Sequence, residues 1–170
     1  MVEAIKKLRI RGAPAIGICA GYCLYRLARD IDAKDTEVFL RKLSVDAELL
    51  GAAAPEQVAF TANATESLNL VAYSYGMNFL HEGDEIVISV AEHHSNMVPW
   101  QRVAKATGAK LVYMYPGENG RLTTEELDKK ITSKTKVVAV AMVSNVLGLR
   151  APVEEIVKRA HAVGAVVVLD

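Results

Sequence analysis

From Ser44 onward, short runs rich in β-branched residues alternate with stretches whose apolar residues recur at helical spacing. The runs cover residues 57–61, 85–89, 110–115, 136–143 and 165–169, and each is almost continuously apolar. Such runs are typical of strands in a parallel sheet whose two faces are both covered by helices, and their alternation with helices is typical of repeated β-α units. The pattern predicts an α/β fold, a three-layer sandwich with a mostly parallel sheet.

The stretches between these runs carry the signals expected at helix ends. Helices are predicted at residues 65–80, 97–107, 123–131 and 153–163. Thr123 and Glu126 have the spacing of a capping box, and Pro152 stands where a helix opens. Glycines that close helices before the next strand are Gly83, Gly108 and Gly164.

The first 50 residues differ in kind, because they contain no convincing strand. Apolar residues from Ile16 to Ile31 line one face of a predicted helix, and a second helix is predicted at residues 36–50, with Asp35 as its cap. We therefore divide the chain into an all-helical segment, residues 1–50, and an α/β domain, residues 51–170. The two are expected to pack as one globular unit.

Composition and charge exclude several classes of protein. Hydrophobic residues make up 51% of the 170 residues, which is a globular rather than a disordered mixture. Lys+Arg and Asp+Glu are both 20, so no excess positive charge favours a nucleic acid or an anionic membrane surface. The longest apolar run, Val137 to Val143, is too short to span a membrane, and no signal peptide opens the chain. We expect no nucleic-acid or membrane partner and a cytoplasmic location.

Candidate metal and redox residues are few. Cys19 and Cys23 lie one helical turn apart in an apolar stretch, which suits buried free thiols; a redox or metal role is the alternative. His93 and His94 are adjacent, but no third ligand is evident. No metal site is predicted.

The motif RGAPAIG at residues 11–17, followed by a helix of small residues, resembles the N-terminal region of methylthioribose-1-phosphate isomerases. The resemblance runs to about residue 50 and implies that Arg11, Gly12 and Ala13 contact a phosphosugar. Arg11 offers a forked donor for phosphate, and Gly12 allows close approach of the backbone. The alternative is a turn that leads into the helix and carries a solvated arginine. The catalytic cysteine and aspartate of that family have no counterpart in this chain.

Residues 51–170 instead resemble the pyridoxal-phosphate-binding domain of cysteine desulfurases of the SUF/NIF type, which have the class V aminotransferase fold. The motifs that carry this resemblance are FTANATE (60–66), NLVA (69–72), GDE (83–85), EHHSN (92–96), VPW (98–100), VSNVLG (143–148), AH (160–161), GA (164–165) and LD (169–170). The family implies that the third, second, fourth and fifth predicted strands lie side by side in that order. The place of the first strand, residues 57–61, is left open.

The resemblance also implies a set of cofactor-binding residues. Ala64 and Thr65 open a helix directly after the first predicted strand, where backbone N–H groups and the Thr65 hydroxyl would hold the cofactor phosphate. The family often has a hydroxyl residue at the position of Ala64, so one donor is missing here. His93, after the second strand, would stack on the pyridine ring. The alternatives are a helix N-terminus without a ligand and a structural histidine.

Two further residues follow later strands. The family implies that Asn145, at the end of the fourth strand, hydrogen-bonds the phenolic oxygen of the cofactor; the alternative is an asparagine that caps the next turn. Asp170 ends the fifth strand and would pair with the protonated pyridine nitrogen, which keeps the ring electron-poor. The alternative for Asp170 is an ordinary terminal acid.

Pyridoxal chemistry needs a lysine that carries the cofactor as a Schiff base, and desulfurisation needs a nucleophilic cysteine. In the family both follow the strand that ends in the aspartate, and no lysine or cysteine of this chain matches their positions. From this we expect a non-enzyme: an engineered or recombined chimera of truncated parts, with a mainly structural role and no covalently bound cofactor. The first alternative is a non-catalytic remnant of a cysteine desulfurase that binds pyridoxal phosphate or phosphate weakly. The second is a split cysteine desulfurase completed in trans.

Truncation would leave apolar surface uncovered. An open sheet edge beside the first or fifth predicted strand, and the apolar helix at residues 14–31, are both surfaces that a second copy could cover. A homo-oligomer is therefore expected.

Overall fold

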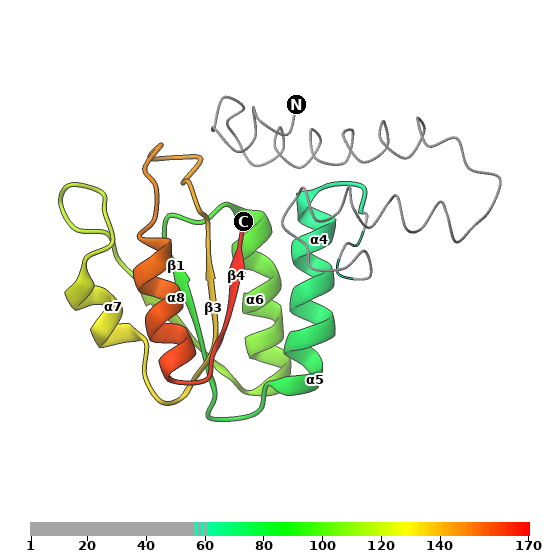
Figure 1. The fold of residues 1–170 in the computed structure, drawn as a ribbon. Helices are drawn as coiled ribbons and strands as arrows, with labels where there is room; N and C mark the ends of the chain where they lie inside the picture. Colours follow the sequence, from blue (N-terminus) through cyan, green and yellow to red (C-terminus); the bar gives the residue numbers. More distant parts are fainter. Residues whose placement is uncertain (1–56, 58, 60) are drawn as a thin grey trace, which may run out of the picture. The chain divides into compact units, whose positions relative to one another are not determined.

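The computed structural model describes Gln57, Ala59 and residues 61–170. Within this part, Ala64–Asp170 form one compact unit (Figure 1). The predicted helical segment at residues 1–50, with Arg11, Gly12, Ala13, Cys19 and Cys23, lies outside the described residues.

The compact unit alternates helices and strands as the sequence predicts. In chain order its elements are α4 (Ala64–Val71), the π-helical turn η2 (Ala72–Gly76), α5 (Met77–Phe79), β1 (Glu85–Ser89), α6 (His94–Thr107), β2 (Lys110–Met114), α7 (Thr124–Lys130), β3 (Thr135–Val140), α8 (Val153–Ala162) and β4 (Val166–Leu169). The α/β fold class is confirmed.

The four strands form one parallel sheet in the order β2-β1-β3-β4. This is the side-by-side order that the desulfurase resemblance implies. The chain first moves from β1 outward to β2, then crosses back over β1 to β3 and continues to β4. The direction of winding therefore reverses between β1 and β3, and such a switch point opens a crevice at the carboxyl ends of the strands.

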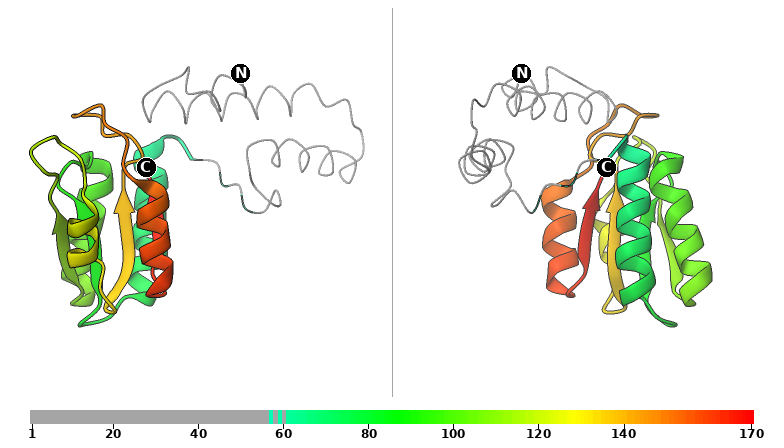
Figure 2. Two further views of the ribbon diagram at one scale, coloured as in Figure 1. Left: turned by 60° about the vertical axis from the view of Figure 1, so that its left-hand side comes forward. Right: turned by 90° about the vertical axis from the view of Figure 1, so that its right-hand side faces the viewer.

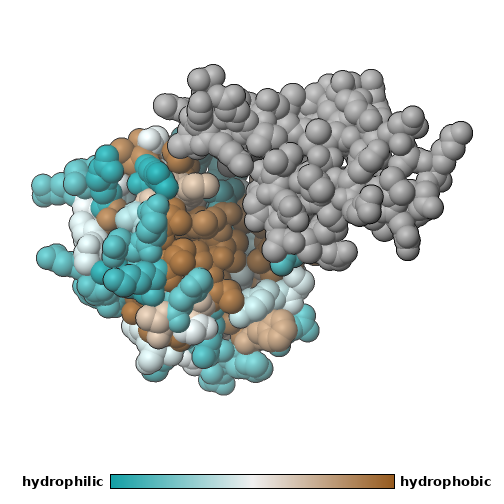
Figure 3. All heavy atoms as spheres, viewed as in Figure 1, coloured by the Kyte–Doolittle hydropathy of each residue, from teal (hydrophilic) through white to brown (hydrophobic). Residues whose placement is uncertain are grey.

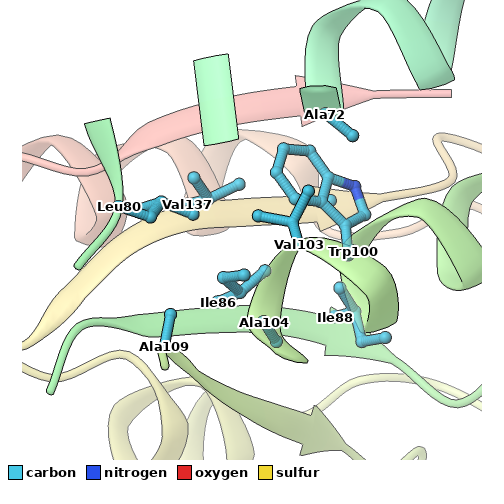
Figure 4. Close-up of a cluster of buried hydrophobic side chains, with 10 residues drawn as sticks. Ala72, Leu80, Ile86, Ile88, Trp100, Val103, Ala104, Ala109 and Val137 are labelled. Carbon is cyan, nitrogen blue, oxygen red and sulfur yellow. The ribbon is translucent and has the colours of Figure 1, made fainter. Parts of the chain in front are cut away.

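Helices cover both faces of the sheet (Figure 2). On one face, α4 and α6 pack on Ile86, Ile88, Val137 and Ala139, with Trp100 fully buried at the centre (Figure 4). On the other face, buried side chains of α7 and α8 pack on the opposite sides of the same strands; they are Leu127, Ile156 and Ala160 against Val87, Val138 and Val140. The two clusters explain the continuous apolar runs, because successive residues of each strand enter different cores.

The turn η2 packs so closely on α6 at Gly76 that any larger side chain there would displace its neighbours. A Cβ atom built on Gly76 would lie 2.6 Å from Cγ1 of Val103 and 3.4 Å from Cζ3 of Trp100. Gly76 ends the π-helical turn, so the irregular turn and the close contact occur at the same place.

Apolar surface gathers over β4, the edge strand, between α8 and α4 (Figure 3). Val166, Val167 and Val168 are partly buried there, and Leu169 is exposed. The sequence predicts association with a second copy at an edge of this kind; the association itself stays a prediction.

The three largest differences from the predicted boundaries concern the first predicted strand, β3 and α6. At the described residues of the first predicted strand, Gln57, Ala59 and Thr61, there is no strand. β3 ends at Val140 rather than at residue 143, because the chain turns into a loop that is closed by an antiparallel bridge between Val143 and Arg150. α6 begins at His94 rather than at residue 97.

The predicted capping box of α7 is half formed. The Thr123 hydroxyl accepts a hydrogen bond from the backbone N–H of Glu126 at 3.2 Å, as predicted. The Glu126 carboxylate, however, accepts from the backbone N–H of Tyr115 at 2.8 Å and so joins α7 to the end of β2. In the part of the chain that the structure describes, no helix is long and apolar enough to cross a membrane.

Candidate active site

The carboxyl ends of the parallel strands bring several polar residues to one edge of the sheet. β1 leads into Glu92 and His93, β3 leads into the loop that contains Ser144 and Asn145, and β4 leads into Asp170. The Ser144 hydroxyl donates to the backbone carbonyl of Ala91 at 3.1 Å. This bond links the loops after β1 and β3 across the switch point, where open α/β sheets bind ligands.

His93 is held by the start of α6 and presents its ring to solvent. Its Nδ1 accepts from the backbone N–H of Ser95 at 3.2 Å and lies 2.7 Å from the Ser95 hydroxyl, so His93 is the N-cap of the helix. Because Nδ1 is an acceptor, the neutral ring carries its proton on Nε2. The ring is therefore fixed in orientation at one end and exposed over the rest.

Asp170 lies half-buried beyond β4 and its backbone continues the ladder with β3. Its N–H donates to the carbonyl of Val140 at 3.1 Å, and its carbonyl accepts from Met142 at 2.9 Å. Burial raises the pKa of the Asp170 carboxyl, while the nearby His93 ring acts in the opposite direction. Both residues follow the carboxyl ends of strands in the same sheet, His93 after β1 and Asp170 after β4.

Ala64 and Thr65 begin α4, as predicted, and Thr65 is exposed. The beginning of α4 lies at the same end of the unit as the C-terminal residue Asp170 (Figure 1). The predicted phosphate-binding helix terminus thus opens at the same end of the sheet as His93 and Asp170.

Asn145 lies in an exposed turn after β3, not at the end of the strand. Ser144, rather than Asn145, caps this turn: its hydroxyl accepts from the N–H groups of Val146 and Leu147 at 3.3 and 3.2 Å. Among the described residues, no hydrogen bond joins the Asn145 side chain to another group.

A buried hydrogen-bond network next to His93 in the sequence, formed by Glu92, Asn96 and Trp100, was not among the predicted site residues. Glu92 is 7% exposed and its carboxylate accepts from Nδ2 of Asn96 at 2.7 Å. Oδ1 of Asn96 in turn accepts from Nε1 of Trp100 at 3.3 Å, and the backbone N–H of Ala141 also donates to Glu92. The signal available in the sequence was the four-residue spacing: Asn96 and Trp100 lie on one face of α6, and Glu92 precedes the helix by the same interval.

Glu92 carries the largest electrostatic perturbation among the described residues. Burial raises the pKa of Glu92 to about 7, and the negative charge of Asp170 adds to the rise, although hydrogen bonds from Ala141 and Asn96 oppose it. A recess beside Glu92 is lined also by Ser89, Ser144, Arg121 and Arg150. Titratable groups with shifted pKa values in a recess at a switch point are typical of functional sites.

The described residues offer no cluster of metal ligands. No group of three histidine, cysteine or acidic side chains in the described part of the chain is placed to hold a metal ion. The rings of His93 and His94 lie 6.3 Å apart, centroid to centroid.

Comparison with known proteins identifies the relatives of this chain. The family described as Aminotransferase class-V matches residues 41–170. A probable cysteine desulfurase of Halalkalibacterium halodurans is 51% identical over 119 residues, which are 70% of this chain and 29% of the relative. A probable cysteine desulfurase of Synechocystis sp. is 42% identical over 147 residues, 86% of this chain and 35% of the relative. The chain spans about a third of the length of these curated relatives.

Solved structures show the same similarity. The cysteine desulfurase CsdA of Escherichia coli, in an S-sulfonic acid form, superposes with a TM-score of 0.71 and 33% identity over 91% of this chain and 41% of its own. The apo cysteine desulfurase of Thermococcus onnurineus superposes with a TM-score of 0.70 and 34% identity over 99% of this chain and 40% of its own.

These comparisons correct one prediction and refine another. The prediction of a non-enzyme is wrong, because the matched relatives are cysteine desulfurases and the chain spans only part of their length. The missing lysine and cysteine therefore do not decide whether the protein is an enzyme. The family match begins at residue 41, so similarity to the class V fold starts before the predicted boundary at residue 51.

Proposed function

Because this chain belongs to the class-V aminotransferase family, we propose that its α/β unit binds pyridoxal 5′-phosphate as the cofactor-binding part of a cysteine desulfurase. The observation that carries the proposal is that His93, after β1, and Asp170, after β4, both lie at the carboxyl edge of one parallel sheet and interact electrostatically. An exposed, oriented imidazole and a half-buried carboxylate together suit a flat ring that bears a protonated nitrogen.

Hydrogen bonds orient both His93 and Asp170 for the roles proposed here. The Ser95 contacts fix the plane of the His93 ring, so a stacking face is available without further ordering. The backbone bonds to Val140 and Met142 hold Asp170 at the end of the sheet, where its carboxylate would accept from a pyridinium N–H. His93 would thus set the plane of the ring and Asp170 its protonation state.

The phosphate end of the cofactor would lie at the beginning of α4. Thr65 offers a hydroxyl there, and the helix N-terminus favours a negative group. Ala64 contributes no side-chain donor. Asn145, in the exposed turn after β3, is proposed to donate to the phenolic oxygen.

The bound cofactor supplies an electron-accepting ring that assists bond breaking at an amino-acid substrate. The residues of this unit orient the ring and balance its charge. We propose cysteine as the substrate of the complete protein, from the names of the relatives.

Four earlier expectations stay predictions. They are the isomerase-like origin of residues 1–50 with a chimeric chain, the division into segments 1–50 and 51–170, the homo-oligomer, and the cytoplasmic location without nucleic-acid or membrane partners. Arg11, Gly12 and Ala13, the phosphosugar-contacting residues that the isomerase resemblance implies, lie outside the described part of the chain.

Thermal melting with and without ligand tests the proposed function. Pyridoxal 5′-phosphate at about 100 times its dissociation constant is expected to stabilise the folded chain by about 2.7 kcal/mol. Thr65→Ala is expected to weaken binding about tenfold, because one hydrogen bond to a charged phosphate is lost.

Thr124→Ala is the matched control, because Thr124 is an exposed threonine at the start of α7. It should leave the ligand-induced shift unchanged. Inorganic phosphate should give a smaller shift with the same dependence on Thr65. If neither pyridoxal 5′-phosphate nor phosphate moves the melting temperature, the proposed function is wrong.

A further inference from the structure

Glu92 connects the ring site to the core of the α/β unit. It lies between β1 and α6, accepts from Asn96 in α6 and from the backbone of Ala141 after β3, and interacts electrostatically with Asp170 after β4. Asn96 also accepts a hydrogen bond from the indole N–H of Trp100, which is fully buried between α6 and the sheet. A single carboxylate thus contacts or faces three of the elements that build the site.

Several charged or titratable groups surround Glu92, so its protonation depends on their charges. Asp170 is the acidic group next to it: Ala141, whose backbone N–H donates to Glu92, lies between Val140 and Met142, which both hydrogen-bond the backbone of Asp170. Arg121 and Arg150, from the loops after β2 and β3, line the same recess, and His93 is its neighbour in the chain. A change of charge at Asp170 therefore alters the free energy of ionising Glu92.

We propose that Glu92 is a positioning residue that exchanges a proton with solvent as the charge facing Asp170 changes, so that a cationic ring at Asp170 releases the proton of Glu92. This inference rests on the proposed function for its ligand, a pyridinium ring. Its chemistry is simple: the proton leaves the Glu92 carboxyl for water, and the carboxylate keeps the hydrogen bonds from Asn96 and Ala141. A negative Glu92 then offsets the positive charge that the ring brings.

The raised pKa of the Glu92 carboxyl is consistent with this role. Burial raises the pKa of Glu92 to about 7, so protonated and ionised forms coexist near neutral pH. A small electrostatic change is then enough to shift the population between them.

The protein contains a single tryptophan, which provides a direct readout. The indole N–H of Trp100 gives one signal in a ¹H–¹⁵N spectrum, and this N–H donates to the amide that contacts Glu92. We expect its chemical shift to titrate with a midpoint at about pH 7. Glu92→Gln, which keeps the size of the side chain, should abolish this titration, and the remaining signals report whether the variant is folded.

Asp170→Asn tests the coupling without any ligand. Removal of the negative charge should move the Trp100 midpoint downward by about 0.3–0.5 pH unit. An unchanged midpoint in Asp170→Asn, or an unchanged titration in Glu92→Gln, overturns the inference.

Saturation with pyridoxal 5′-phosphate tests the coupling with its proposed ligand. Binding is followed independently at the backbone amide of Thr65, and the Trp100 midpoint should fall by a similar amount. Binding at Thr65 without a shift of the midpoint overturns the inference but leaves the proposed function standing. Absence of binding overturns the proposed function, and the comparison with Asp170→Asn then decides the coupling alone.

Discussion

Replacement of Trp100 by alanine is expected to lower the free energy of unfolding of the chain by about 3–5 kcal/mol. The indole is fully buried where α4, α6 and the sheet meet, against Ala72 and Ile88 (Figure 4). Its loss leaves a cavity and also deprives Oδ1 of Asn96 of its donor. Denaturant unfolding at constant pH measures the change.

Two further variants separate these causes. Trp100→Phe keeps most of the volume but removes the indole N–H, and is expected to cost about 1–3 kcal/mol for the unpaired amide oxygen. Arg102→Ala, on the exposed side of the same helix, should change the free energy of unfolding by less than about 0.5 kcal/mol. A Trp100→Ala variant as stable as Arg102→Ala would contradict the packing described for this face.

Glu92 is expected to make the chain less stable as the pH rises from about 4.5 to about 7. The folded state raises the pKa of this carboxyl from 4.5 to about 7, so between these values the folded chain holds a proton that the unfolded chain has lost. Stability therefore falls with rising pH in this window, by about 3 kcal/mol in total, and is constant above it. The partly buried Asp170 adds a change of the same sign, because its pKa is also raised.

Glu92→Gln removes the titrating group and should remove most of this fall. Unfolding free energies at pH 5, 6, 7 and 8 provide the measurement, with Glu125→Gln as the control because Glu125 is exposed on α7. The control should follow the wild-type pH dependence. Parallel pH profiles for wild type and Glu92→Gln would show that Glu92 ionises normally in the folded chain.

The strands were largely predictable because their sequence signals are local. The run at residues 85–89 coincides with β1, and the run at 110–115 exceeds β2 by one residue. The run at 136–143 predicts a strand that ends three residues too late, because Ala141, Met142 and Val143 are as apolar as the strand before them. The strand ends there for a tertiary reason: the N–H of Ala141 donates to Glu92, and the loop then folds back.

The start of α6 shows a second limit. Histidine is not among the residues favoured at an N-cap, and proline favours the first turn of a helix. In the fold, His93 caps the helix through Nδ1, and Pro99 lies inside it. The same side chain thus serves the helix and the proposed ring site, which propensities alone do not indicate.

The candidate site was predictable in part. The motifs located His93 and Asp170, and the order of the strands brings them to one edge. The role of Glu92 could not be predicted, because its burial and its contacts come from α6, β3 and β4 together. Asn145 lies in an exposed turn after β3 rather than at the end of the strand, because β3 ends earlier than its apolar run predicts.

The central claim is that His93, Asp170 and the start of α4 form one pyridoxal-phosphate site. Titration of the ¹⁵N-labelled chain with pyridoxal 5′-phosphate, followed through backbone amide shifts, tests it most directly. We expect saturable shifts at Thr65, His93 and Asp170 with one common dissociation constant, and none at the exposed residues of α7. Shifts that do not saturate, or that follow different dissociation constants at Thr65 and at Asp170, would contradict the claim.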